Sequence, residues 1–124
     1  MTHRPVLVLA SDDLAGALLA ALAETAGLSP VFAGPSETPR DALRRLRPDI
    51  VLVDCEHETA CSEQFLGPVR MTGATALVFG RGADAERLRG LGDQHHVRVF
   101  TLPIDADELD RTIREAVNGK DGAR

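Results

Sequence analysis

The segment DIVLVDCEH at residues 49–57 decides the fold. Its apolar run, Ile50 to Val53, is typical of a strand that is buried on both faces of a sheet. The run ends at Asp54, so a carboxylate lies where the strand leaves the core. Asp54 is therefore either an active chemical group at the edge of the sheet or a structural carboxylate held by backbone N–H groups and solvent.

Length and charge limit what the chain can be. Its 124 residues match one domain, and a hydrophobic fraction of 44% can form a single core. A formal net charge of −5 argues against nucleic-acid or membrane partners, because both require a basic face. No apolar run reaches the roughly 18 residues of a membrane span. The N-terminus lacks the architecture of a signal peptide, so we expect a cytoplasmic protein.

Short apolar runs alternate with helical patterns along the chain. Strands are expected at residues 6–9, 30–33, 50–53, 76–79 and 97–102, and helices at 14–26, 38–47, 61–70, 83–91 and 105–118. This alternation predicts one doubly wound α/β domain, with a five-stranded parallel sheet and five helices. The domain is expected to occupy residues 1–119, with residues 120–124 as a disordered tail. Pro30 predicts that the second strand lies at an edge.

The first helix has a regular leucine pattern. Leu14, Leu18 and Leu22 recur every four residues, so we expect them to form its buried face. Asp12 or Asp13 is expected to cap its N-terminus. Ligands of doubly wound sheets bind at the carboxyl ends of the strands, so the residues that follow each strand are the candidates for function.

Three segments resemble parts of a response regulator receiver domain, and the resemblance extends over nearly the whole chain. The family's third strand, which ends in the phosphoacceptor aspartate, is similar to RPDIVLVD at residues 47–54. The exit of its fifth strand and its last helix are similar to LPIDADEL at residues 102–109. The first helix, which ends in LAETAGLSPV at residues 22–31, also has the family's spacing. The resemblance implies a two-component signalling module in which a phosphorelay delivers phosphate to Asp54.

The family's chemistry requires partners for that aspartate, and several are replaced here. A Ser or Thr after the fourth strand and a Lys after the fifth bind the phosphoryl oxygens in the family. In this chain the hydroxyl position falls on Gly80 and the lysine position on Leu102, and neither side chain has a donor. The resemblance therefore implies an atypical, degenerate receiver, with Asp54 retained as the phosphoacceptor candidate.

The family's acidic pair after the first strand binds Mg²⁺ together with the phosphoacceptor. Counted back from the end of the first helix, that pair falls on Ala10 and Ser11. A shift of one or two residues would make Asp12 and Asp13 the pair, and these could then ligate Mg²⁺ with Asp54. The simpler alternative is that Asp12 and Asp13 only cap the first helix.

The loop after the third strand contains Cys55, His57 and Cys61, which invites a zinc or redox interpretation. Structural zinc sites generally need four ligands, and a fourth is not evident here. Cysteine is more often a small buried residue, so we expect Cys55 to belong to the core.

Two further patterns are weak. The tripeptide Gly80-Arg81-Gly82 lacks the longer fingerprint of a phosphate-binding loop. The basic cluster Arg40, Arg44, Arg45 and Arg47 is most simply the solvated face of the second helix. No arrangement of nucleophile and base can be placed at the carboxyl edge, so we expect no enzyme.

Three hypotheses follow. The first is a phosphorylation-independent module that contacts a signalling protein, which is a kinase, an output protein or a second copy in a homodimer. The resemblance implies that the contact uses the fourth helix, the fifth strand and the last helix, and no cofactor is required. The second is a conventional receiver that uses Asp54 and Mg²⁺. The third is a small-molecule-binding module whose pocket is widened by Gly80 and Ala10.

Overall fold

The structure, a computed structural model, describes residues 5–95, 97–102, 107–108, 110–112 and 114–115. Its strands are β1 (Pro5–Leu9), β2 (Ser29–Phe32), β3 (Ile50–Asp54), β4 (Thr75–Arg81) and β5 (Arg98–Leu102). Its helices are α1 (Asp13–Thr25), α2 (Pro39–Leu46), α3 (Glu63–Met71) and α4 (Ala85–His95), with a short 3-10 helix, η1 (Gly82–Asp84), before α4. The described residues between 107 and 115 are helical too, as expected of a fifth helix.

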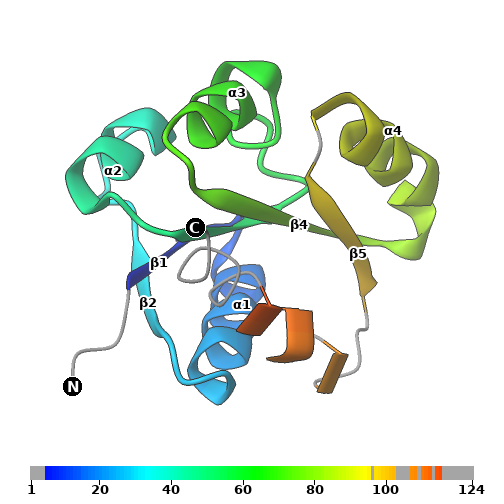
Figure 1. Cartoon of the computed structure of the whole chain (residues 1–124), viewed down its shortest axis with the longest axis horizontal. Coiled ribbons are helices and arrows are strands. Elements are labelled where there is room, and N and C mark those ends of the chain that lie inside the picture. The colour runs from blue at the N-terminus through cyan, green and yellow to red at the C-terminus, as the bar shows by residue number, and fades with distance from the viewer. Residues whose placement is uncertain (1–4, 96, 103–106, 109, 113, 116–124) are drawn as a thin grey trace.

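The strands form one parallel sheet in the order β2-β1-β3-β4-β5. Figure 1 shows α2, α3 and α4 on one face of this sheet. On the other face lie α1 and the helical residues between 107 and 115 (Figure 1). The predicted doubly wound α/β architecture is therefore confirmed. The strand order reverses between β1 and β3, which places the topological switch point beside Asp54.

Two core clusters fill the two faces of the sheet. Successive side chains of a strand point to opposite faces, so β1 and β3 contribute to both clusters. The cluster under α2, α3 and α4 includes Leu7, Leu9, Val51 and Val53, and the cluster under α1 includes Val6, Val8, Ile50 and Leu52. All eight side chains are buried, which is why these strands read as uninterrupted apolar runs.

Local signals in the sequence located several elements correctly. Pro30 lies in β2, which is an edge strand as predicted. Asp12 caps α1, because its Oδ1 accepts a hydrogen bond from Ala15 N at 2.8 Å. Thr38 caps α2 in the same way, with its Oγ1 accepting from Asp41 N at 3.1 Å. Each cap satisfies an N–H group that a helix leaves unpaired in its first turn.

The predicted buried face of α1 was wrong. Leu14 is 78% exposed and Leu18 is 44% exposed, although Leu22 packs partly against the core. The buried face consists instead of Gly16, Leu19 and Ala23. Apolar residues occupy nearly every side of this helix, so the leucine spacing alone could not determine its rotation. Small residues settle it, because α1 approaches the sheet closely at Gly16, where an added Cβ would lie 3.4 Å from the Phe32 ring.

The junction between β4 and α4 also differs from the prediction. β4 continues to Arg81, because Gly80 and Arg81 pair with Thr101 and Leu102 of β5. The 3-10 helix that follows delays the start of α4 to Ala85. Gly80 is therefore a strand residue, whereas it was expected in the loop after the strand.

The predicted tail at residues 120–124 and the proposed boundary at residue 119 lie outside the described residues. The start of the last helix at 105–106 lies outside them as well. In the described part of the chain, no helix combines the length and apolar character needed to cross a membrane.

The rotation of α1 can be tested with two leucine substitutions. We expect Leu19→Ala to lower the free energy of unfolding by about 2–4 kcal/mol, because it leaves a cavity against the sheet. We expect Leu14→Ala, on the exposed side of the same helix, to change it by less than about 0.5 kcal/mol. Urea denaturation measures both values. Equal losses for the two variants would contradict the observed rotation.

Candidate functional site

The candidate site lies at the carboxyl edge of the sheet, and Asp54 is its central group. Asp54 is the last residue of β3 and only 8% exposed. Its Oδ2 accepts hydrogen bonds from Ser11 Oγ at 2.6 Å and from Ser11 N at 3.0 Å. Its Oδ1 accepts a third from Glu56 N at 3.0 Å. Both carboxylate oxygens are therefore engaged by the protein itself.

These contacts determine the charge state of Asp54. Burial by itself would raise the pKa of the carboxyl. The hydrogen bonds from the Ser11 hydroxyl, Ser11 N and Glu56 N act against burial, and the nearby His57 adds to them. Together they hold the pKa of Asp54 below its usual value. Asp54 is therefore a carboxylate at neutral pH, and the neutral donors on Ser11 and Glu56 contribute more to this than the charge of His57 does.

Asp54 pairs with Phe79 of the neighbouring strand β4, and Gly80 is the next residue of that strand. A Cβ at Gly80 would lie 2.9 Å from Leu88 Cδ1 and 3.3 Å from the Cβ of Cys55. Leu88 belongs to α4 and is 1% exposed, so it has little freedom to withdraw. The Cβ of a Ser or Thr at this position would therefore meet the end of the Leu88 side chain, which would have to shift.

A second contact from α4 holds the same region in place. Arg87 Nη2 donates a hydrogen bond to the backbone carbonyl of Cys55 at 2.9 Å. Cys55 N in turn donates to Phe79 O at 2.7 Å, which extends the pairing of β3 with β4. The loop after Asp54 is therefore tied both to β4 and to α4. Neither Arg87 nor Leu88 stood out in the sequence, because both contacts exist only once α4 has packed on the sheet.

The structure brings Leu102 to the same place as Asp54 and Gly80. All three line a cavity of about 430 Å³, with Leu14 and Leu18 of α1 on its wall. The charged residues of this cavity are Asp12, Asp54, Glu56, Asp84 and Arg81. Four carboxylates against one guanidinium make the cavity a poor environment for an added phosphoryl group, because like charges repel.

The geometry offers Mg²⁺ a poor set of ligands. Ala10 has no ligand atom in its side chain, and the hydroxyl of Ser11 donates to Asp54. Asp12 is engaged as the cap of α1. Among the residues that the structure describes, no group of three or more His, Cys, Asp or Glu side chains is placed to hold a metal ion. The arrangement of these side chains is a poor fit to Mg²⁺, which prefers several oxygen ligands. The metal site expected from Asp12, Asp13 and Asp54 has not been tested and stays a prediction.

The cysteines of the loop after β3 are core residues. Cys55 and Cys61 are both free thiols and buried. Burial raises the pKa of Cys55 and raises that of Cys61 to about 12, so neither is a thiolate at neutral pH. His57 has a local role, because its Nδ1 accepts a hydrogen bond from Ala60 N at 3.2 Å. This arrangement favours the expected packing role of Cys55.

A larger cavity, of about 740 Å³, opens at the carboxyl ends of β1 and β2. Ala10, Asp13 and Phe32 are among the residues that line it. Both residues at which the sequence suggested a widened pocket thus line open space, Gly80 in the smaller cavity and Ala10 in the larger one.

The role of the Ser11 hydroxyl can be tested by removing it. We expect Ser11→Ala to lower the free energy of unfolding by about 1–2 kcal/mol at neutral pH, because a buried carboxylate loses a short hydrogen bond. The pKa of Asp54 is depressed in the folded state, so this stabilisation is present above the unfolded pKa of about 3.9 and is lost as the pH falls through the folded pKa. The difference between the two proteins should therefore shrink in acid. Urea titrations across the pH range, with Ser36→Ala in an exposed turn as control, measure it. A loss that does not change with pH would contradict this role.

The packing of Leu88 against Gly80 can be tested by a double-mutant cycle. We expect Gly80→Ala to cost about 1–3 kcal/mol of stability, because the new methyl group meets Leu88. In a Leu88→Ala background the same substitution should cost about 1 kcal/mol less or even stabilise, since the space has been vacated. Additive costs in chemical denaturation would show that the two residues do not compete for this space.

Comparison with known proteins rests on structure. No protein-family model matches the chain, and no curated protein matches it in sequence. A response regulator receiver domain protein from Clostridium thermocellum superimposes with a TM-score of 0.77 at 16% identity, covering 98% of this chain and 99% of that one. A response regulator from Thermotoga maritima gives a TM-score of 0.70 at 17% identity, covering 94% and 99%. A response regulator receiver protein from Burkholderia phymatum gives 0.73 at 16% identity, covering 93% and 95%. The chain therefore has the fold of response regulator receiver domains.

Proposed function

We propose that this chain is a signalling module with the receiver fold that acts through protein–protein contact and without phosphorylation of Asp54. The observation that carries the proposal is the pair of hydrogen bonds from Ser11 to Asp54. They give the carboxylate a neutral partner within the protein, in the place where the resemblance leads us to expect an acidic pair and Mg²⁺. The aspartate is then a structural link between the loop after β1 and the end of β3.

The surroundings of Asp54 support the same proposal. A phosphoryl group on Asp54 would bring further negative charge into a cavity that holds three other carboxylates and Arg81. Phosphoryl transfer depends on cations and donors that neutralise this charge. Leu102 supplies neither, and Gly80 has no side-chain donor, while a Cβ added there would meet Leu88. A receiver without residues that bind the phosphoryl group has no contacts through which phosphorylation would change its conformation.

The proposed partner is another signalling protein in the cytoplasm: a kinase, an output protein or a second copy of the chain. We assign the module no catalytic role and no required cofactor. The surface formed by α4, β5 and the helical residues after 107 is the contact that the resemblance suggests. In the described part of the chain, however, the large hydrophobic side chains that are exposed lie on other elements: Leu14, Leu18, Phe32 and Met71.

The test is a titration with beryllofluoride and Mg²⁺, followed by backbone amide NMR. We expect no saturable shifts at Asp54, Gly80 and Leu102, because the site lacks the groups that hold a phosphoryl mimic. A conventional receiver titrated in parallel shows that the reagent is active. Saturable shifts across this edge would overturn the proposal and favour a phosphoacceptor role for Asp54 with Asp12 or Asp13.

Small-molecule binding is kept as a second candidate because of the cavity beside Ala10. Its volume of about 740 Å³ lies in the range of ligand sites. Shifts confined to its lining on addition of metabolite mixtures, with none from beryllofluoride, would favour this function over the first.

A further inference from the structure

The α2 helix and its C-cap concentrate positive charge in a chain whose net charge is −5. Four arginines lie within residues 40–47. Arg45 is engaged, because its Nε and Nη2 donate to the two carboxylate oxygens of Glu37 at 2.7 and 2.8 Å. Arg44 has only a 3.8 Å contact with Asp41, and both side chains are largely exposed, so that pair contributes little. Three arginines, at positions 40, 44 and 47, thus present charge to solvent.

A groove lies between α2 and the C-terminal half of α3, which contact each other. One hollow, of about 370 Å³, is lined by Arg40, Leu43, Arg44, Pro68, Met71 and Thr72. An adjoining hollow of about 340 Å³ includes Arg47, Pro48 and Asp49. Both hollows share Leu43, Arg44 and Thr72, so they form one continuous surface, which we call the α2–α3 groove.

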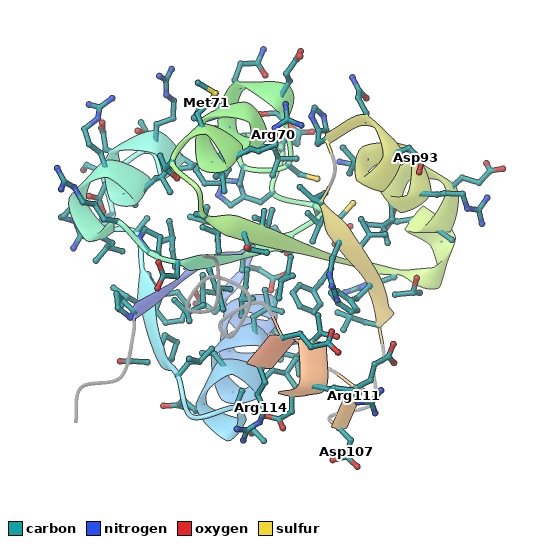
Figure 2. All side chains as sticks on the ribbon, viewed as in Figure 1. Arg70, Met71, Asp93, Asp107, Arg111 and Arg114 are labelled. Atoms are coloured by element: carbon teal, nitrogen blue, oxygen red, sulfur yellow. The ribbon has the colours of Figure 1, made fainter. Side chains whose placement is uncertain are left out.

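Met71 gives this groove an apolar anchor point. It is the last residue of α3 and is 86% exposed. Figure 2 shows its side chain on the outer surface of α3. Arg70 is engaged elsewhere, since its Nη1 donates to the carbonyl of His95 at 3.3 Å. A large flexible thioether beside a hollow suits contact with an apolar side chain of a partner.

Arg47 adds an independent observation. It caps the C-terminus of α2 in the left-handed region, with φ 46° and ψ 54°. Glycine is favoured at such a position, and another residue there costs about 1 kcal/mol. The backbone therefore does not explain the arginine. Its side chain lines the second hollow, where it adds to the positive charge of Arg44.

We propose that the α2–α3 groove binds an acidic segment of a partner protein, with one apolar side chain of that segment packed on Met71 and Leu43. Three arginines against Asp49 in the lining favour carboxylates, and the apolar floor gives the segment a defined register. Nucleic acid is disfavoured, because the chain as a whole is acidic and would repel a phosphate backbone beyond this surface.

This inference goes beyond the proposed function, because the groove and Asp54 lie at opposite ends of the strands. Pro48-Asp49 and Gly73-Ala74, which line the second hollow, immediately precede β3 and β4. Asp54 lies at the other end of β3. A partner in the groove would therefore leave Asp54 uncontacted.

The probe is a fluorescein-labelled amphipathic peptide of about 14 residues, roughly four helical turns, with Leu every third or fourth position and Glu elsewhere. Fluorescence anisotropy gives its affinity, and amide NMR shifts locate it on the protein. We expect saturable binding at millimolar or tighter affinity, shifts confined to residues 40–49 and 67–74, and weakening by added salt. A peptide with Lys in place of Glu is the charge control, and an all-Glu peptide without Leu tests the apolar anchor.

Variants separate the two parts of the groove. We expect Arg40→Glu with Arg44→Glu to weaken binding by about tenfold or more, because two attractive charges become repulsive. We expect Met71→Ser to weaken it by about fivefold through loss of apolar contact. Arg89→Glu, an exposed residue of α4, is the matched control and should change affinity by less than about twofold. All four positions are exposed, so the fold should be unaffected.

Four results would overturn the proposal. The first is the absence of saturable shifts in the groove. The second is an equal loss of affinity in the Arg89→Glu control. The third is a dependence of the groove's own shifts on protein concentration, which would identify the occupant as a second copy of the chain. The fourth is equal or tighter binding of a short single-stranded oligonucleotide to the same residues.

Discussion

The hydrogen bond from the Ser11 hydroxyl to Asp54 is the contact on which the carboxyl edge of this protein depends. It joins the loop after β1 to the end of β3, which is the central strand of the sheet and the neighbour of β1. A carboxylate that is 8% exposed requires compensation, because burial alone would make the charge unfavourable. Ser11 and Glu56 N provide it with neutral donors. These donors are the main contacts that hold the pKa of Asp54 below its usual value.

Neighbouring contacts tie the same edge to α4. Leu88 fills the space at Gly80, and Arg87 holds the carbonyl of Cys55. Both come from one turn of α4, so any movement of that helix would break a packing contact and a hydrogen bond together. A switch between two conformations of this edge requires that the two conformations have similar free energies. Here the contacts of Leu88 and Arg87 all favour one arrangement.

The sequence allowed the fold to be predicted because its signals were local. Each signal depends on one element alone: the uninterrupted apolar run of β3, Pro30 in β2, and the caps at Asp12 and Thr38. The positions of Asp54, Gly80 and Leu102 at one edge followed from the parallel topology. The rotation of α1 could not be predicted, because leucines and alanines surround that helix and only its close approach at Gly16 selects a face. The contacts of Leu88 and Arg87, and the groove beside Met71, could not be predicted either, since they arise only when separate elements pack against each other.

The absence of a side-chain donor at Gly80 has a consequence for how such a protein could be regulated. On the proposed function, no phosphoryl group changes the affinity of the chain for its partner, so partner occupancy depends only on that affinity and on the amounts of the two proteins. The strength of the signal would then follow synthesis and degradation of the chain, over the lifetime of the protein rather than of a phosphoryl bond. The signal from such a module depends on the amount of folded protein. The stability of the fold therefore affects the signal, because a loss of a few kcal/mol in the free energy of unfolding would reduce the amount of protein available for binding.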